Sequence, residues 1–169
     1  MVAFYALLAA VLFGSGDFLG GRATQRTSIL SVLATSHLIG LVLILVMAPL
    51  MAERFDGGDF ALGMAASGFG LLGLGLLYRG LARGPMAVVA PVTAVTCAAL
   101  PVLWGVAFGE ELSGRHVTGI ILGLVSIVLV SRTPAEASVS ASPRLIAESL
   151  LAGVGFAAFY IVIAGTGAA

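Results

Sequence analysis

Charge is what this 169-residue sequence has least of. Asp, Glu, Lys and Arg together make up 9% of the residues, whereas 60% are hydrophobic and the mean hydropathy is +1.15. A soluble domain typically carries about 25% charged residues, which help to cover its surface in water. The scarcity of charge excludes an ordinary soluble domain and indicates that a lipid bilayer surrounds the chain.

The sequence also has no lysine, no excess of basic over acidic residues and no second cysteine. The eight Arg residues are balanced by eight acidic residues, so nucleic acid is not expected as a partner. The single Cys97 excludes an intramolecular disulfide framework and a cysteine zinc cluster. His37 has no second metal-binding side chain near it in sequence, so neither a metal nor a cofactor is expected. No basic residue precedes the first apolar run, which indicates a retained helix rather than a cleaved signal peptide.

Long apolar runs dominate what is present. Most of them approach or exceed the roughly 20 residues that a helix needs to cross a bilayer. A β-barrel would instead show segments of about ten alternating residues. The sequence therefore predicts an all-α integral membrane protein with about six transmembrane helices, over residues 2–21, 28–52, 60–78, 84–109, 117–131 and 145–164.

A Pro-, Ser- and Ala-rich stretch separates the last two runs and indicates a linker. The segments Leu7–Phe13 and Leu150–Phe156 agree at five of seven positions, which favours an internal repeat of the kind found in transporters. A sixth helix without its repeat partners is expected to pack as an orphan and to be among the least protected spans. The predicted organisation is a first five-helix repeat over 1–134, a linker over 135–143 and the first helix of a truncated second repeat over 144–169.

Two stripes of small residues predict close helix packing. Gly68–Gly73 matches G-x-G-x-x-G, but it lies inside an apolar run rather than after a strand, so nucleotide binding is disfavoured. Small residues at helical spacing let two helix backbones approach closely in lipid. The first stripe consists of Ala66, Gly70, Gly73, Leu77 and Gly80. The second consists of Gly119, Gly123 and Ser126, and whether its partner lies in this chain or another stays open.

Asp17 is the most informative candidate site residue. It is the only acid predicted within the interior of a span, and such residues are costly in lipid and usually functional or paired. The preceding Gly14–Gly16 segment is expected to loosen the helix, and Ser15 within it joins Asp17 as a candidate substrate-binding or coupling residue. The alternative is that Asp17 lies near the interface, reaches water and pairs with Arg22. Ser15 lacks the G-x-S-x-G context and the activating base of a hydrolase nucleophile.

The fourth predicted helix carries prolines at positions 91 and 101. Prolines in a span free backbone carbonyls, which are tolerated where they line a cavity or are bonded by neighbours. Thr93, Thr96 and Trp104 are therefore predicted to line a transport pathway. The alternative is a kinked packing helix whose threonine hydroxyls bond to their own backbone. In the second helix, His37 is expected to be neutral, buried and bonded to a neighbouring helix.

Four segments in order resemble the EamA-type members of the drug/metabolite transporter superfamily. Leu12–Phe18 is similar to the family's L-W-G-S-x-[ND]-F pattern, with Phe13 where Trp is common. Glu111 likewise stands where the family commonly has Arg. The other three matches are Leu77–Met86 at the junction of the third and fourth helices, Pro101–Leu112 closing the fourth helix, and Gly119–Pro134 ending in an S-R-x-P tail.

The resemblance implies a fold and a function. Such proteins have ten helices in two inverted five-helix repeats and carry small metabolites by alternating access, so a transporter of a plasma (inner) membrane is expected and an enzyme is not. The resemblance implies a central cavity between the first, third and fourth helices. A homodimer or a missing second half is the expected partner. The alternatives are a non-transporting membrane partner or structural protein, and a half-unit for small-drug or lipid efflux that works as a dimer.

Orientation stays open at this stage. Six arginines fall on one side of the predicted spans, and Arg54 and Arg115 fall on the other. Because cytoplasmic loops are enriched in basic residues, this bias puts the N-terminus outside. The family resemblance implies the opposite, a cytoplasmic N-terminus.

Overall fold

The computed structural model describes residues 2–51, 56–130 and 142–166. Within these ranges the chain forms α-helices joined by short turns, and no strand is present. The prediction of an all-α membrane protein is confirmed. The helices are α1 (Val2–Thr24), α2 (Ile29–Met51), α3 (Gly57–Arg83), α4 (Met86–Ala107), α5 (Gly114–Val130) and α6 (Pro143–Ile163).

Five of these helices, all except α5, are long and apolar enough to cross a membrane. The side chains of α2 illustrate why lipid must be the solvent, because its large apolar residues from Leu38 to Met47 are exposed. In water this surface would be an aggregation site, whereas in a bilayer it meets acyl chains of matching chemistry. α5 has 17 residues and is a shorter apolar helix.

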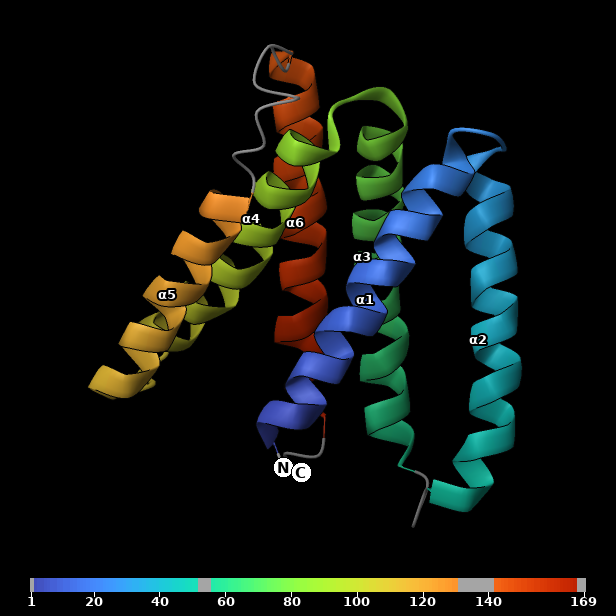
Figure 1. The fold of residues 1–169 in the computed structure, drawn as a ribbon. Coiled ribbons are helices and arrows are strands. Elements are labelled where there is room, and N and C mark those ends of the chain that lie inside the picture. Colours follow the sequence, from blue (N-terminus) through green and yellow to red (C-terminus); the bar gives the residue numbers. More distant parts are fainter. Residues whose placement is uncertain (1, 52–55, 131–141, 167–169) are drawn as a thin grey trace.

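α6 lies at the centre of the assembly. It packs along both α3 and α4, and these are the two most extensive helix pairs of the structure (Figure 1). A larger share of α6 is buried than of any other span. The expectation that the sixth helix packs as an orphan is therefore wrong: its small residues fit the groove between the two earlier helices.

Backbone contact between α3 and α6 depends on glycine. A methyl group added at Gly155 of α6 would lie 2.9 Å from the Cα atom of Gly73 in α3. One added at Gly73 would lie 3.0 Å from the backbone oxygen of Ala152. The predicted stripe on α3 is thus confirmed as a packing face, with Gly70 against Phe159 of α6 and Gly80 against Val89 of α4.

The remaining helices surround this central group. α1 crosses α3, α2 contacts α1 and α3, and α5 contacts only α4 among the described helices (Figure 1). No described Cα atom of α1 lies within 8 Å of α4 or α6. α1 is thus held through its C-terminal half, where Gly20, Gly21 and Thr24 are buried.

We use the term "arginine end" for the end of the bundle where α1 and α3 finish and where α2, α4 and α6 begin (Figure 1). Arg115 begins α5 at the opposite end. This separation matches the predicted loop sides for all the arginines that the structure describes, whereas Arg54 and Arg132 lie outside the described residues. The arginine end carries Arg22, Arg26, Arg79, Arg83 and Arg144.

Candidate functional site

Asp17 lies on the face of α1 that turns toward α3. Three residues later, Gly20 lies against the phenol ring of Tyr78, whose hydroxyl occupies the place that a side chain at position 20 would take. Because residues three apart share a helix face, Asp17 and the Tyr78 hydroxyl lie on the same side of α1. The lack of a side chain at Gly20 is what allows this approach.

The neighbouring helices carry two further polar side chains. Tyr160 of α6 is 45% exposed and packs edge-on against Phe159, and Cys97 of α4 is half-buried. No described Cα atom of α1 lies within 8 Å of α4 or α6. Among these polar residues, the geometry therefore places Tyr78 on the Asp17 side of α1.

The Asp17 carboxylate is half-buried and has no hydrogen bond or ion pair within the described residues. The alternative pairing with Arg22 is not present, because Arg22 is exposed and unpaired in the same part of the chain. α1 also continues as a regular helix through Gly14–Gly16, so the expected loosening of this segment is not observed. Asp17 lies about 10 Å before the last residue of α1, at 1.5 Å per residue.

Ser15 does not join this group. It is exposed, and two helical residues are separated by about 200° around the axis, so it points away from the side that Asp17 occupies. The glycines on either side of it have no neighbouring atom within 4 Å of where a side chain would begin. The structure therefore separates the two candidate residues of α1.

Thr93 and Thr96 lie at the crossing of α4 and α6. The Thr93 hydroxyl is buried and donates a hydrogen bond of 3.1 Å to the backbone oxygen of Ser149. The Thr96 hydroxyl donates to its own helix, at Val92 O, over 2.8 Å. A side chain at Gly153 of α6 would lie 2.5 Å from Thr96 Cβ, so the two helices are in direct contact here. In this arrangement α6 fills the space that these threonines face.

Trp104 lies near the C-terminal end of α4. The residue is 51% exposed, and its ring packs on that of Phe108 with centroids 4.4 Å apart. It is therefore on the outside of the bundle, and the structure does not bring it together with Asp17. The pathway-lining roles of Thr93, Thr96 and Trp104 stay predictions.

The interpretation of His37 is wrong. Its side chain is exposed, and Nδ1 lies 2.8 Å from the backbone oxygen of Leu33, four residues earlier in α2. In the Nδ1–H tautomer the ring donates to this carbonyl. The hydrogen bond is satisfied inside the helix, so a neighbouring helix is not needed.

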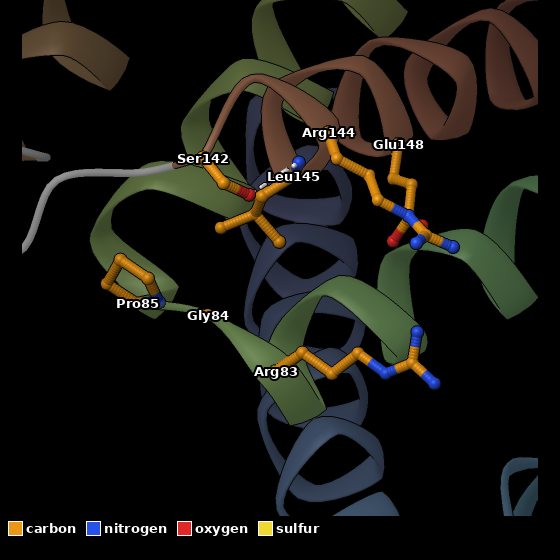
Figure 2. Close-up of a pocket in the computed structure, with 7 residues that line it drawn as sticks. All are labelled: Arg83, Gly84, Pro85, Ser142, Arg144, Leu145 and Glu148. Carbon is orange, nitrogen blue, oxygen red and sulfur yellow. Dashed lines mark hydrogen bonds and ion pairs between the residues drawn. The ribbon is translucent and has the colours of Figure 1, made fainter.

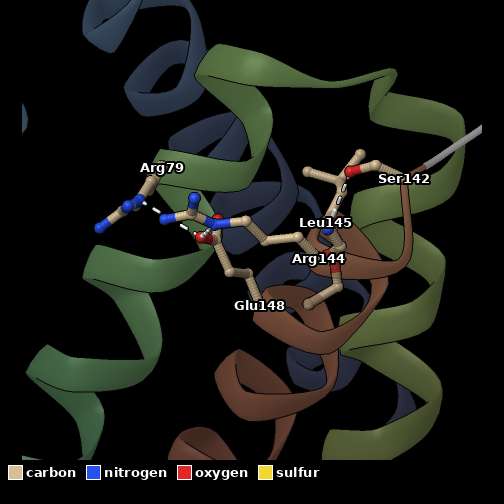
Figure 3. A network of polar contacts seen from close by, with 6 residues as sticks. Arg79, Ser142, Arg144, Leu145 and Glu148 are labelled. Carbon is tan, nitrogen blue, oxygen red and sulfur yellow. Dashed lines mark hydrogen bonds and ion pairs between the residues drawn. The ribbon is translucent and has the colours of Figure 1, made fainter.

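A charged cluster at the arginine end was missed by sequence analysis. Glu148 of α6 accepts a hydrogen bond of 3.2 Å from Arg144 Nε and forms an ion pair with Arg79 of α3, with Nε 3.6 Å away (Figure 3). Only 15% of the Glu148 side chain is exposed. The available signal was Glu148 itself, an acid in the first turn of a predicted span, four residues after an arginine.

The sequence itself matches a known family. A model described as the EamA-like transporter family matches residues 1–132, which include α1 to α5. Comparison with curated proteins and with solved structures gives no significant match.

Proposed function

Because this chain belongs to the EamA-like transporter family, we propose that it carries a small metabolite across a plasma (inner) membrane by alternating access. The family resemblance noted in the sequence is confirmed. Membership, together with the apolar helices, makes the chain a multi-pass membrane transporter of the EamA type, and members of this family are transporters rather than enzymes. The substrate and the mechanism are the proposed part.

The observation that carries the proposal is the unpaired carboxylate of Asp17 within a span. An acid at this depth is costly unless it binds a proton, a cation or a polar partner during function. Tyr78 supplies a hydroxyl that both donates and accepts hydrogen bonds on the same side of α1. We propose that Asp17 exchanges a proton for a cationic or hydrogen-bonding group of the substrate, and that Tyr78 orients that group.

The domain organisation is part of the same proposal. We propose that residues 1–134 form the first repeat and that α6 begins a second one, after a linker at 135–143. An odd number of helices per repeat makes the second repeat start in the opposite direction, and α6 runs antiparallel to α1 (Figure 1). The facing half of the pathway would come from a second repeat or from a second copy of the chain, with the bilayer as the surrounding partner.

The test is transport by the protein in liposomes that contain a pH-sensitive dye. Pools of amino acids, amines and other small metabolites are added outside, and substrate-dependent proton movement is recorded. We expect Asp17→Asn to insert and fold normally, because the side chain keeps its size, but to lose proton-coupled transport. The matched control is Glu111→Gln, which removes one exposed acid outside the spans. Unchanged transport by the Asp17 variant, with an unchanged pH profile, contradicts the proposed role.

A further inference from the structure

The arginine end contains a pocket that the transport proposal does not use. It has a volume of about 410 Å³, within the range of about 300–1,000 Å³ that is usual for small-molecule sites. It opens between the turn that joins α3 to α4 and the first turns of α6 (Figure 2). The lining residues are Arg83, Gly84, Pro85, Ser142, Arg144, Leu145 and Glu148.

The charge around this pocket is unbalanced. Glu148 is the only acid among the described residues that line it, and Arg144 and Arg79 already hold that carboxylate. Arg83 has no ion pair within the described residues, and its guanidinium stands apart from Arg144 and Glu148 (Figure 2). Among the described residues, two lining arginines against one lining glutamate leave one positive charge, and Arg79 beside them adds a second, so the pocket favours an anion.

The helix ends add to this preference. α4 and α6 both begin beside the pocket, and the N-terminus of a helix carries a partial positive charge that favours anions. The C-terminus of α3 carries the opposite, partial negative charge, which disfavours anions. Its last turn contains Arg83, however, and the carbonyl oxygen of Gly80 already accepts a hydrogen bond of 2.8 Å from the Gly84 N–H. The arginines are the main source of attraction, and the helix ends support them.

Helix length places the pocket in the headgroup layer of the membrane. The 27 residues of α3 span about 40 Å, which exceeds a hydrocarbon core of about 30 Å. The last turn of α3, with Arg83, therefore emerges from the acyl chains at the depth where lipid phosphates lie. The side chains of Pro85 and Leu145 give the pocket an apolar wall beside its charges.

We propose that Arg83 and Arg144 form a binding site for a phosphate-bearing anion at the arginine end. A guanidinium offers paired N–H donors that match two phosphate oxygens, which an ammonium group cannot do. The apolar wall accommodates the carbon skeleton next to the phosphate. The phosphate belongs either to the headgroup of an anionic lipid or to a soluble phosphorylated metabolite, and both have the chemistry that this pocket selects.

The experiment compares two double variants of the full chain. Arg83→Gln with Arg144→Gln removes two pocket charges, and Arg22→Gln with Arg26→Gln removes two exposed charges at the same end that do not line the pocket. Retention of phosphatidylglycerol and of zwitterionic phosphatidylcholine is measured by native mass spectrometry. Binding of inorganic phosphate and glycerol 3-phosphate is measured by thermal shift in lipid-free detergent.

The expected result is a loss of anion affinity on the order of fivefold per pocket arginine, with little change in the control pair. Preferential retention of phosphatidylglycerol identifies a lipid site, whereas stabilisation by the soluble phosphates identifies a metabolite site. Equal losses in the two double variants, or equal retention of the two lipids without any effect of soluble phosphate, would overturn the proposal. If the pocket double variant does not fold, Arg83→Gln against Arg26→Gln gives the same comparison, because neither side chain has an ion pair among the described residues.

Discussion

Individual glycines decide where these helices meet. Gly68 and Gly73 lie in the same helix, yet only Gly73 faces another backbone, whereas Gly68 has no neighbouring atom within 4 Å of where its side chain would begin. Between helices in lipid the hydrophobic effect contributes little, and van der Waals contact between closely approaching backbones supplies much of the attraction. The two positions therefore have very different tolerance for the same substitution.

We expect Gly73→Ala to destabilise the protein by about 1–3 kcal/mol, because its methyl group would lie 3.0 Å from backbone atoms of α6 that cannot rotate away. The melting temperature in detergent, followed by circular dichroism, measures the effect. Gly68→Ala is the matched control in the same helix and should be neutral or slightly stabilising. If the two variants melt at the same temperature, backbone contact between α3 and α6 does not contribute as described.

Sequence analysis of single residues worked where the signal is local and failed where the partner is distant. The first stripe of small residues, which contains Gly73, follows helical spacing and could be predicted. Glu148 pairs with an arginine of α3 that is far away in the chain, and no pattern connects the two. His37 was misassigned because its own helix supplies an acceptor four residues earlier.

Among the helices, α6 differs most from its expected role. Its buried residues include Ser149, Ala152, Gly153, Gly155 and Ala157, all small, and they face both α3 and α4. The existence of the six helices followed from the lengths of the apolar runs, but their pairing did not, since an apolar face is equally compatible with lipid and with another helix. The position of Tyr78 on the Asp17 side of α1 was unpredictable for the same reason, because this tyrosine comes from another helix.

Hydrogen exchange tests the position of α6. We expect backbone amides of α6 to be better protected than those of α2 and α5, because local opening is rarest where helices are buried on several sides. The measurement is exchange followed by mass spectrometry of the protein in detergent micelles. Faster exchange in α6 than in α2 would show that α6 does not occupy the groove between α3 and α4.

For the whole molecule, the distribution of arginines defines two ends but leaves their orientation open. Of the arginines in the described ranges, five gather at one end and Arg115 lies at the other, which by the positive-inside rule makes the arginine end cytoplasmic. That orientation puts the start of α1 outside, contrary to what the resemblance to the family implies. The opposing indications make a direct measurement necessary.

Labelling of a single cysteine decides the question. Gly57 is exposed at the start of α3, opposite the arginine end, so Gly57→Cys in a Cys97→Ala background presents one thiol at that end. If the arginine end is cytoplasmic, an impermeant maleimide should label this thiol in intact cells. Labelling that requires lysis would instead support a cytoplasmic start of α1.

The central place of α6 also has a consequence for biosynthesis. α3 and α4 are made first, yet the groove between them is filled by a helix that leaves the ribosome about 80 residues after the start of α4, which takes roughly 4–15 s at common translation rates. During that interval the glycine face of α3 and the Thr93 hydroxyl of α4 lack the partner they have in the finished protein. The core of this protein can therefore close only after its sixth helix has been translated.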